Sequence, residues 1–119
     1  MNGLSQLAII MVALVALLHC GFVILEMFFW DHPIGRSIFD MTAEVSASSA
    51  PLAKQQALYN GFLVAGLIWG LVTARRDVLL FFLLCVIAAG GFAALTVKPS
   101  IFISQAVPGI IALILAMRR

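Results

Sequence analysis

Four long apolar runs, separated by short segments that hold most of the polar and charged residues, make up this chain. They cover residues 4–30, 51–73, 78–97 and 100–117. A helix needs roughly 20 apolar residues to cross a hydrocarbon layer of about 30 Å, and each run is near that length. The pattern therefore predicts an all-α fold, an integral membrane four-helix bundle.

The composition favours this fold over a soluble one. Of the 119 residues, 64% are hydrophobic and only 10% are charged. A small soluble domain has too much surface for its volume to bury so many apolar residues. We therefore expect a single transmembrane domain over residues 1–119, with the lipid bilayer as its first partner. The net charge of +2 is dispersed at helix ends, so no nucleic-acid partner is expected.

Two features that can signal processing or redox chemistry have simpler interpretations here. No Lys or Arg precedes the first apolar run, which continues well beyond a signal-peptide core of roughly 7 to 15 residues, so we expect a retained helix. Cys20 and Cys85 lie inside apolar runs and lack the paired spacing of a metal site or redox motif. We expect both to be packing residues, with no metal and no cofactor.

The distribution of Lys and Arg predicts the orientation of the helices, because these residues accumulate in short loops on the cytoplasmic side. One side of the predicted bundle carries four of them, and the other carries three together with three acidic residues. We therefore expect both termini and the loop near residue 75 to be cytoplasmic. The four are Arg75, Arg76, Arg118 and Arg119, and the opposite side holds Arg36, Lys54, Lys98, Asp31, Asp40 and Glu44.

The segment 31–50 is too long for a tight turn and too polar to span a membrane. Apolar residues recur in it at helical spacing, and charged residues follow one another at four-residue steps on a second face. This pattern predicts a short amphipathic helix on the outer membrane surface, with an irregular loop as the alternative. The apolar residues are Ile34, Ile38, Met41 and Val45, and the charged ones are Arg36, Asp40 and Glu44.

Small residues in the second and third runs predict close helix packing. Gly66 and Gly70 have the small-xxx-small spacing that lets two helices approach, and Gly90 and Gly91 can act in the same way. Such spacing usually serves packing within one bundle. It also leaves a homo-oligomer open.

Polar side chains from all four predicted helices collect in the outer half of the bundle. Glu26 lies four residues before Trp30, which is typical of a membrane interface, and hence about 6 Å below that interface. An ionised carboxylate in hydrocarbon costs at least a few kcal/mol, so Glu26 must be protonated, paired or facing a wet cavity. The inner halves of the last three helices are almost entirely apolar. The other outer polar residues are Gln56, Tyr59, Asn60, Thr96, Lys98, Ser104 and Gln105.

Two helices offer Glu26 polar partners. Gln56 and Asn60 lie one turn apart on one face of the second helix, and both can reach toward the carboxyl group. In the fourth helix, Pro108 cannot donate a hydrogen bond to the carbonyl of Ser104. That oxygen is therefore left for another helix, a water or a ligand.

Three further residues are candidates for accessory roles. His19 lies seven residues before Glu26, hence about 10 Å deeper, where it is a proton relay, an axial ligand or a buried core histidine. Lys98 is a candidate ion partner of Glu26, and Trp30 lies at the interface above it.

These residues together resemble the small bacterial membrane proteins grouped as domain-of-unknown-function family 1304. The resemblance implies a four-helix architecture in a bacterial inner membrane, with no established activity. It supports Glu26, Tyr59, Asn60 and Gln105 as motif positions. Gln55 stands where the family usually has asparagine, so the chain departs from the family pattern there. The residues that carry the resemblance are Leu25-Glu26-Met27 followed by Trp30, the run 56–63 with Tyr59-Asn60-Gly61-Phe62, and Gln105 with Pro108.

Three functions fit this arrangement. The first is a pocket that binds or transports a small molecule, with proton coupling at Glu26; it would be formed by Glu26, Gln56, Tyr59, Asn60 and Gln105. The second is a structural or accessory membrane subunit, in which these groups only tie the helices together. The third is a membrane enzyme acting on a lipid-soluble substrate, although no catalytic motif, paired carboxylate or nucleophile supports it. We expect the pocket.

Overall fold

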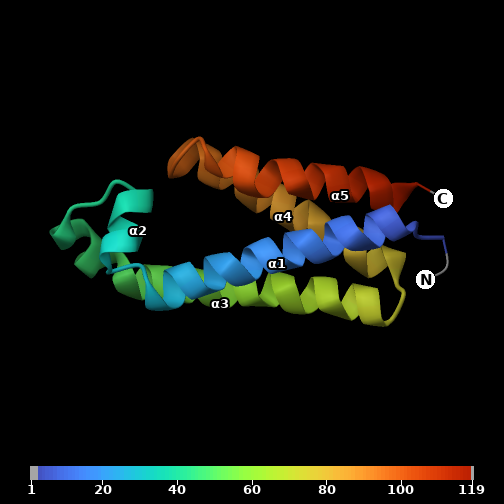
Figure 1. The fold of residues 1–119 in the computed structure, drawn as a ribbon, viewed down its shortest axis with the longest axis horizontal. Coiled ribbons are helices and arrows are strands. Elements are labelled where there is room, and N and C mark those ends of the chain that lie inside the picture. Colours follow the sequence, from blue (N-terminus) through green and yellow to red (C-terminus); the bar gives the residue numbers. More distant parts are fainter. Residues whose placement is uncertain (1–2, 119) are drawn as a thin grey trace.

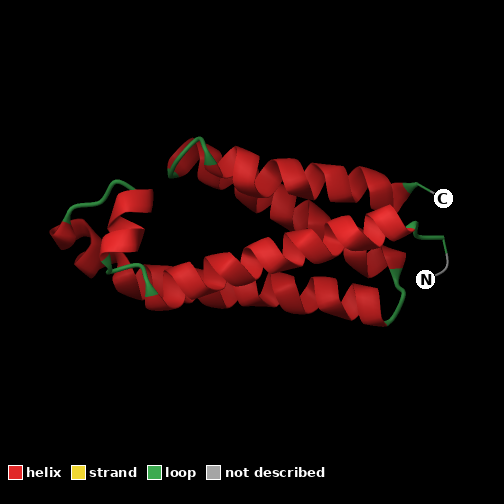
Figure 2. Ribbon diagram, viewed as in Figure 1, coloured by secondary structure: helices red, strands yellow, loops and turns green. Residues whose placement is uncertain are grey.

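The computed structural model describes residues 3–118, which form helices joined by short turns, with no strand in that range (Figure 2). The predicted all-helical class is confirmed. The helices are α1 (Gln6–Phe28), α2 (Pro33–Ile38), α3 (Ala43–Val72), α4 (Arg76–Thr96), the π-helix η1 (Phe102–Ala106) and α5 (Val107–Met117).

We call α1, α3, α4 and the continuous unit of η1 with α5 the four long helices. They run up and down along the longest axis of the molecule, which measures about 50 Å. Helix α1 packs along α3 and α4 packs along α5, and contacts of α3 with α4 and of α1 with α5 join the two pairs. Both ends of the described chain lie at one end of the bundle, beside the α3–α4 turn, whereas α2 lies at the other end (Figure 1). We call the end with α2 the distal end.

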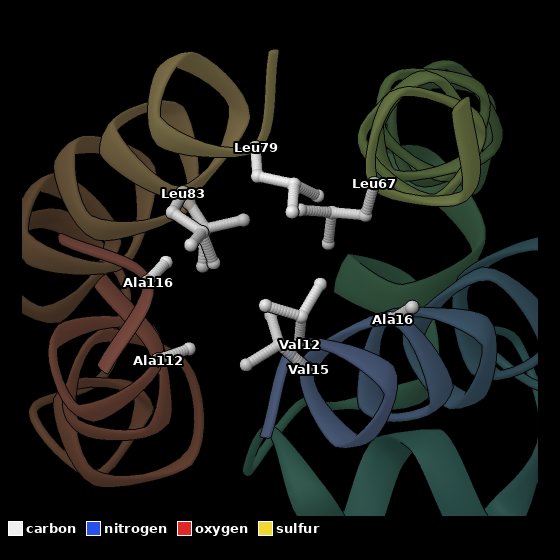
Figure 3. Packing of buried hydrophobic residues seen from close by; sticks show 9 residues of the cluster. Val12, Val15, Ala16, Leu67, Leu79, Leu83, Ala112 and Ala116 are labelled. Carbon is white, nitrogen blue, oxygen red and sulfur yellow. The ribbon is translucent and has the colours of Figure 1, made fainter. Parts of the chain in front are cut away.

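The hydrophobic core lies in the half of the bundle that contains the chain ends. Side chains from all four long helices meet there and are almost completely shielded (Figure 3). Branched residues on α1, α3 and α4 interdigitate, and alanines on α5 let that helix approach closely. The cluster consists of Val12, Val15, Ala16, Leu67, Leu79, Leu83, Val86, Ala112 and Ala116.

Two helices begin at side-chain caps that the sequence supplies. The hydroxyl of Ser5 accepts a hydrogen bond from the backbone N–H of Ala8 at 3.0 Å, and the hydroxyl of Thr42 accepts one from Val45 at 3.2 Å. Each satisfies a backbone donor that has no partner inside the helix. Helices α1 and α3 therefore start where these caps stand.

The expected start of the second long helix, at Pro51, is wrong. Helix α3 begins at Ala43 and continues through Pro51. Serine and proline resemble a helix start, but the hydroxyls of Ser48 and Ser49 instead donate to the carbonyl of Val45, one turn back in the same helix. The serines thus stay inside the helix, and the proline only removes one backbone donor from it.

The expected continuous charged face of segment 31–50 is also wrong. Helix α2 is a short helix between α1 and α3, but it ends at Ile38, and Asp40 adopts a left-handed conformation with φ 53°. This conformation interrupts the helical repeat, so Asp40 and Glu44 do not extend the face of Arg36.

The outer surfaces of the long helices are strongly apolar. Helices α1 and α4 are long and apolar enough to cross a membrane, and Phe102–Met117 forms a shorter apolar helix. Leu17 and Leu95 have 68% and 88% of their surface exposed, and many other large apolar side chains also point outward. Apolar surface on this scale is unusual for a soluble monomer and is typical of contact with lipid or a partner.

Glycine contacts predict which helix faces tolerate a side chain. A Cβ atom at Gly66 would lie 2.4 Å from ring atoms of Phe82, whereas one at Gly61, on the same helix, would meet nothing within 4 Å. We expect Gly66→Ala to lower the free energy of unfolding by about 1 to 3 kcal/mol through overpacking. Gly61→Ala should be neutral or stabilise by up to about 1 kcal/mol. Thermal unfolding in detergent measures both, and equal effects would contradict the packing of α3 on α4.

Candidate functional site

A cavity of about 850 Å³ occupies the distal half of the bundle. Its wall comes from the last turns of α1, the first half of α3, the end of α4 and η1, and Ile38 of α2 with Phe39 after it complete the lining. Most of the lining is apolar. The polar lining residues are Glu26, Ser49, Gln56, Asn60, Thr96, Lys98, Ser100, Ser104 and Gln105, and the aromatic ones are Phe22, Trp30, Phe39 and Phe92.

A hydrogen bond between α1 and α3 holds the acidic group of the cavity. The amide Nδ2 of Asn60 donates to Oε1 of Glu26 at 2.6 Å. Asn60 is 5% exposed, and Glu26 is half-buried. Within residues 3–118, the other carboxyl oxygen accepts no hydrogen bond, and Glu26 takes part in no ion pair. One oxygen of the carboxyl group is thus fixed by the protein, and the other is available to a ligand or water.

The π-helix η1 brings its own amide to the wall. The N–H of Val107 bonds to the carbonyl of Phe102, five residues back, which is the pattern of a π turn. Pro108 follows directly and has no N–H to donate to the carbonyl of Ser104, so an ordinary α-helical bond is missing at this point. The missing donor at Pro108, which the sequence indicates, thus stands directly after a π turn, a feature frequent at functional sites.

Close backbone contact positions Gln105. Its Nε2 donates to the carbonyl of Val86 at 3.3 Å, and the residue is buried. A Cβ atom at Gly90 would lie 2.9 Å from the backbone nitrogen of Ala106 and 3.0 Å from Cγ of Gln105. Glycine at position 90 is therefore what lets η1 pack directly on α4.

Trp30 lines the distal end of the cavity. Its indole Nε1 donates to the hydroxyl of Ser49 at 2.8 Å, and its ring lies 4.7 Å from that of Phe39, measured between centroids. The tryptophan thus connects the end of α1 to both α3 and the turn after α2. Trp30 was expected at the interface above Glu26, and in the structure it lies in the wall of the cavity that also contains Glu26.

Lys98 lines the cavity but is not the ion partner expected for Glu26. Its ammonium group bonds to the carbonyl oxygen of Ile38 and lies 3.4 Å from a carboxyl oxygen of Asp40. The left-handed turn at Asp40 places that carboxyl group beside the end of α4. Lys98 therefore connects the α4–η1 turn to α2, and its charge is balanced there.

Tyr59 and His19 lie outside the cavity, although both were candidates. Tyr59 is 51% exposed, stacks edgewise on Phe62 and contacts Gln55, because it is one residue, or about 100°, away from the face of Asn60. His19 is buried, and its Nδ1 lies 2.9 Å from the carbonyl oxygen of Val15. Its Nε2 has no hydrogen-bond partner in residues 3–118.

A second polar network supports the distal end. The carboxyl of Asp31 accepts hydrogen bonds from the hydroxyl of Ser46 at 2.6 Å and from Arg36 at 3.0 Å. Arg36 also donates to Ser46, which is completely buried. These contacts tie α1, α2 and α3 together. Helical periodicity in the sequence does not predict contacts across a turn, so these bonds are visible only in the structure.

The described residues form no cluster of metal-binding side chains. No group of three His, Cys, Asp or Glu side chains within residues 3–118 is placed to hold a metal ion. Cys20 and Cys85 are free, and both are half-buried. The polar chemistry of the described chain is therefore concentrated in the cavity and in the Asp31 network.

The protein is thus a helical bundle with apolar outer surfaces. The cavity at its distal end has a mostly apolar wall that contains the carboxyl group of Glu26. Residues 13–117 match the family described as "Protein of unknown function (DUF1304)". The chain belongs to that family, and the resemblance noted in the sequence is confirmed. No curated protein and no solved structure matches the chain.

The Asp31 network predicts a pH dependence. Hydrogen bonds from Ser46 and then from Arg36 hold the pKa of Asp31 below its ordinary value of 3.8. A lowered pKa means that the network stabilises the fold above that ordinary value and loses this contribution as the pH falls through the lowered one. Ser46→Ala should lower the unfolding temperature in detergent at pH 7, and the deficit should shrink toward about pH 3.

Ser48→Ala is the matched control, since that hydroxyl bonds only to the carbonyl of Val45 in its own helix. It should have little effect at either pH. A deficit of Ser46→Ala that stays constant from neutral to acidic pH would show that the serine acts without Asp31.

Proposed function

We propose that this protein is a single transmembrane domain that binds a small molecule in its distal cavity, with Glu26 as the group that exchanges a proton. The membrane part of the proposal is supported by the two long apolar helices and by the exposed apolar side chains around the bundle. All four long helices would then span the bilayer, with the polar first turns of α3 and the whole of α2 outside it.

The cavity is the observation that carries the binding part. Pockets for small molecules have volumes of roughly 300 to 1,000 Å³ and apolar walls with a few polar groups that orient the ligand. This cavity, at about 850 Å³, has such a wall, and Glu26 offers it a carboxyl oxygen with no protein partner in residues 3–118. A cluster that served only to tie the helices would not need a space of this size among its members.

The core supports binding more directly than transport. Below the cavity, Val12, Leu67 and Leu83 fill the space where the four long helices meet. A molecule in the cavity therefore has no path to the other end unless these helices separate. Transport would need a second state in which the core opens and the distal end closes.

The accessory role is the second candidate. The bond between Asn60 and Glu26 joins α1 to α3 inside the bundle, as a contact that fixes helix register would. In that case the cavity would be a by-product of the packing, and a homo-oligomer or larger complex would be the functional unit.

Orientation follows from the charges at the bundle ends. Arg75 lies in the α3–α4 turn and Arg76 begins α4, at the end that holds both ends of the described chain, and Arg76 bonds to the carbonyl of Gly3. Under the rule that such residues stay cytoplasmic, the cavity would open in the outer half of a bacterial inner membrane.

Two substitutions at Glu26 separate the candidate functions. Glu26→Gln keeps the shape and an oxygen for Asn60 but removes the proton, so the fold should stay intact while pH-dependent binding or transport is lost. Glu26→Ala leaves Asn60 without its acceptor and should destabilise by about 1 to 2 kcal/mol. Unfolding in detergent, together with uptake or binding at two pH values in vesicles, measures both. Unchanged pH dependence in a folded Glu26→Gln protein would contradict the proton role of Glu26, and absence of any binding or uptake by the unsubstituted protein would leave the accessory role.

Cysteine labelling tests the orientation. Ala47 is exposed in the first turns of α3, and Thr73 is exposed in the α3–α4 turn. With Cys20 and Cys85 replaced by alanine, Ala47→Cys should react with an impermeant thiol reagent added outside intact cells, and Thr73→Cys should react only after lysis. The reverse pattern would invert the orientation, and labelling of both in sealed cells would contradict the four-span arrangement.

A further inference from the structure

We propose that the ligand of this cavity is an amphipathic amine, a molecule with one ammonium group and an apolar or aromatic body. The inference rests on the proposed binding function and names the class of molecule that the wall selects. It follows from the charges of the wall, from its aromatic rings and from the space between them.

The two charged groups of the wall differ in how far the protein already pairs them. Glu26 and Lys98 are the charged residues that line the cavity. Lys98 is already balanced by Asp40 and by the carbonyl oxygen of Ile38. Glu26 has only the neutral amide of Asn60, so an ammonium group at its free oxygen would give it the cation that the described residues do not supply.

The remaining polar groups facing the cavity are neutral. Helix α3 contributes Gln56 and Asn60, and η1 contributes Ser104 and Gln105. Amide and hydroxyl oxygens accept hydrogen bonds from an ammonium group, and an ionised carboxylate is the strongest acceptor available for it. An anionic head group would instead meet the carboxyl of Glu26 without a free cation to compensate.

Aromatic rings provide the second part of the recognition. Phe22 comes from α1, Trp30 from the turn after α1, Phe39 from the turn after α2, and Phe92 from α4, so separate parts of the chain contribute rings to the wall. The faces of such rings attract ammonium groups, and their area packs against apolar bodies. The rings thus suit an organic amine and offer nothing to a hydrated metal ion, which needs several oxygen ligands.

The cavity is too large to be filled by one of the smallest amines. A space of about 850 Å³ corresponds to a drug-sized molecule rather than to a single ammonium group. We infer that the apolar body of the ligand fills the aromatic part while its ammonium group reaches Glu26.

Three probes with one body and different head groups test this inference: phenylbutylamine, phenylbutanol and phenylbutyrate. Trp30 lines the cavity and Trp69 does not, so in the Trp69→Phe protein in neutral-lipid nanodiscs the fluorescence of Trp30 reports occupancy. We expect the amine to bind about tenfold more tightly than the alcohol, the difference of one order in Kd that a charged contact can give. The butyrate should bind most weakly.

Glu26→Gln in the same background should reduce the affinity for the amine to that for the alcohol, and binding of the alcohol should persist, which shows that the cavity is intact. Glu44→Gln is the matched control, because it makes the same change of charge at an exposed position outside the cavity wall.

The outcomes distinguish this inference from the function on which it rests. Equal binding of amine and alcohol would overturn the ligand class, and an amine preference that survives Glu26→Gln would overturn Glu26 as the group that recognises the ammonium. Either result would keep a binding cavity. Tightest binding of the butyrate, lost in Lys98→Gln, would assign the cavity to anionic amphiphiles instead. Binding of none of the three probes would contradict the binding function itself.

Discussion

A carboxyl group inside an apolar helix bundle needs a polar partner, and the bond from Asn60 to Glu26 meets this requirement in a way that shapes the distal half of the protein. It joins α1 to α3 at 2.6 Å and uses only one carboxyl oxygen. Neither α4 nor α5 supplies a cation to Glu26 within residues 3–118. Instead α1 and α3 stay together, and a cavity remains between them and the end of α4 with η1.

The two halves of the bundle illustrate opposite uses of small residues. Toward the chain ends, Gly66 lies against the ring of Phe82, and Ala112 and Ala116 let α5 meet the core directly. At the distal end, Gly90 lets η1 pack on α4, which carries Gln105 into the wall. Small residues thus allow close helix packing in one half, and in the other half they allow the contact that positions a polar group. The packed half gains dispersion contacts that stabilise the fold, whereas the half with the cavity has fewer of them.

Apolar run length predicted the helical class and the existence of each long helix, because that signal is strong and local. Signals that depend on neighbours failed. Pro51 resembled a helix start until the serines before it found acceptors in their own helix, and Asp40 broke a repeat that looked continuous. Of the candidate site residues, Glu26, Gln56, Asn60 and Gln105 share the cavity, as their common depth suggested. Tyr59 was included for its depth and as a motif position, and the 100° step between adjacent helix residues places it outside the cavity wall.

What the sequence could not provide is the direction of side chains across turns. Lys98 and Glu26 have opposite charges at similar depth, yet the lysine bonds to α2, because the left-handed turn at Asp40 presents both a carbonyl and a carboxylate to it. This choice matters beyond the pair itself. An ion pair of Lys98 with Glu26 would have neutralised the cavity wall, whereas the observed pairing leaves its acidic group to be matched from outside the described chain. The selectivity that we infer for the cavity therefore depends as much on the turn after α2 as on the carboxyl group.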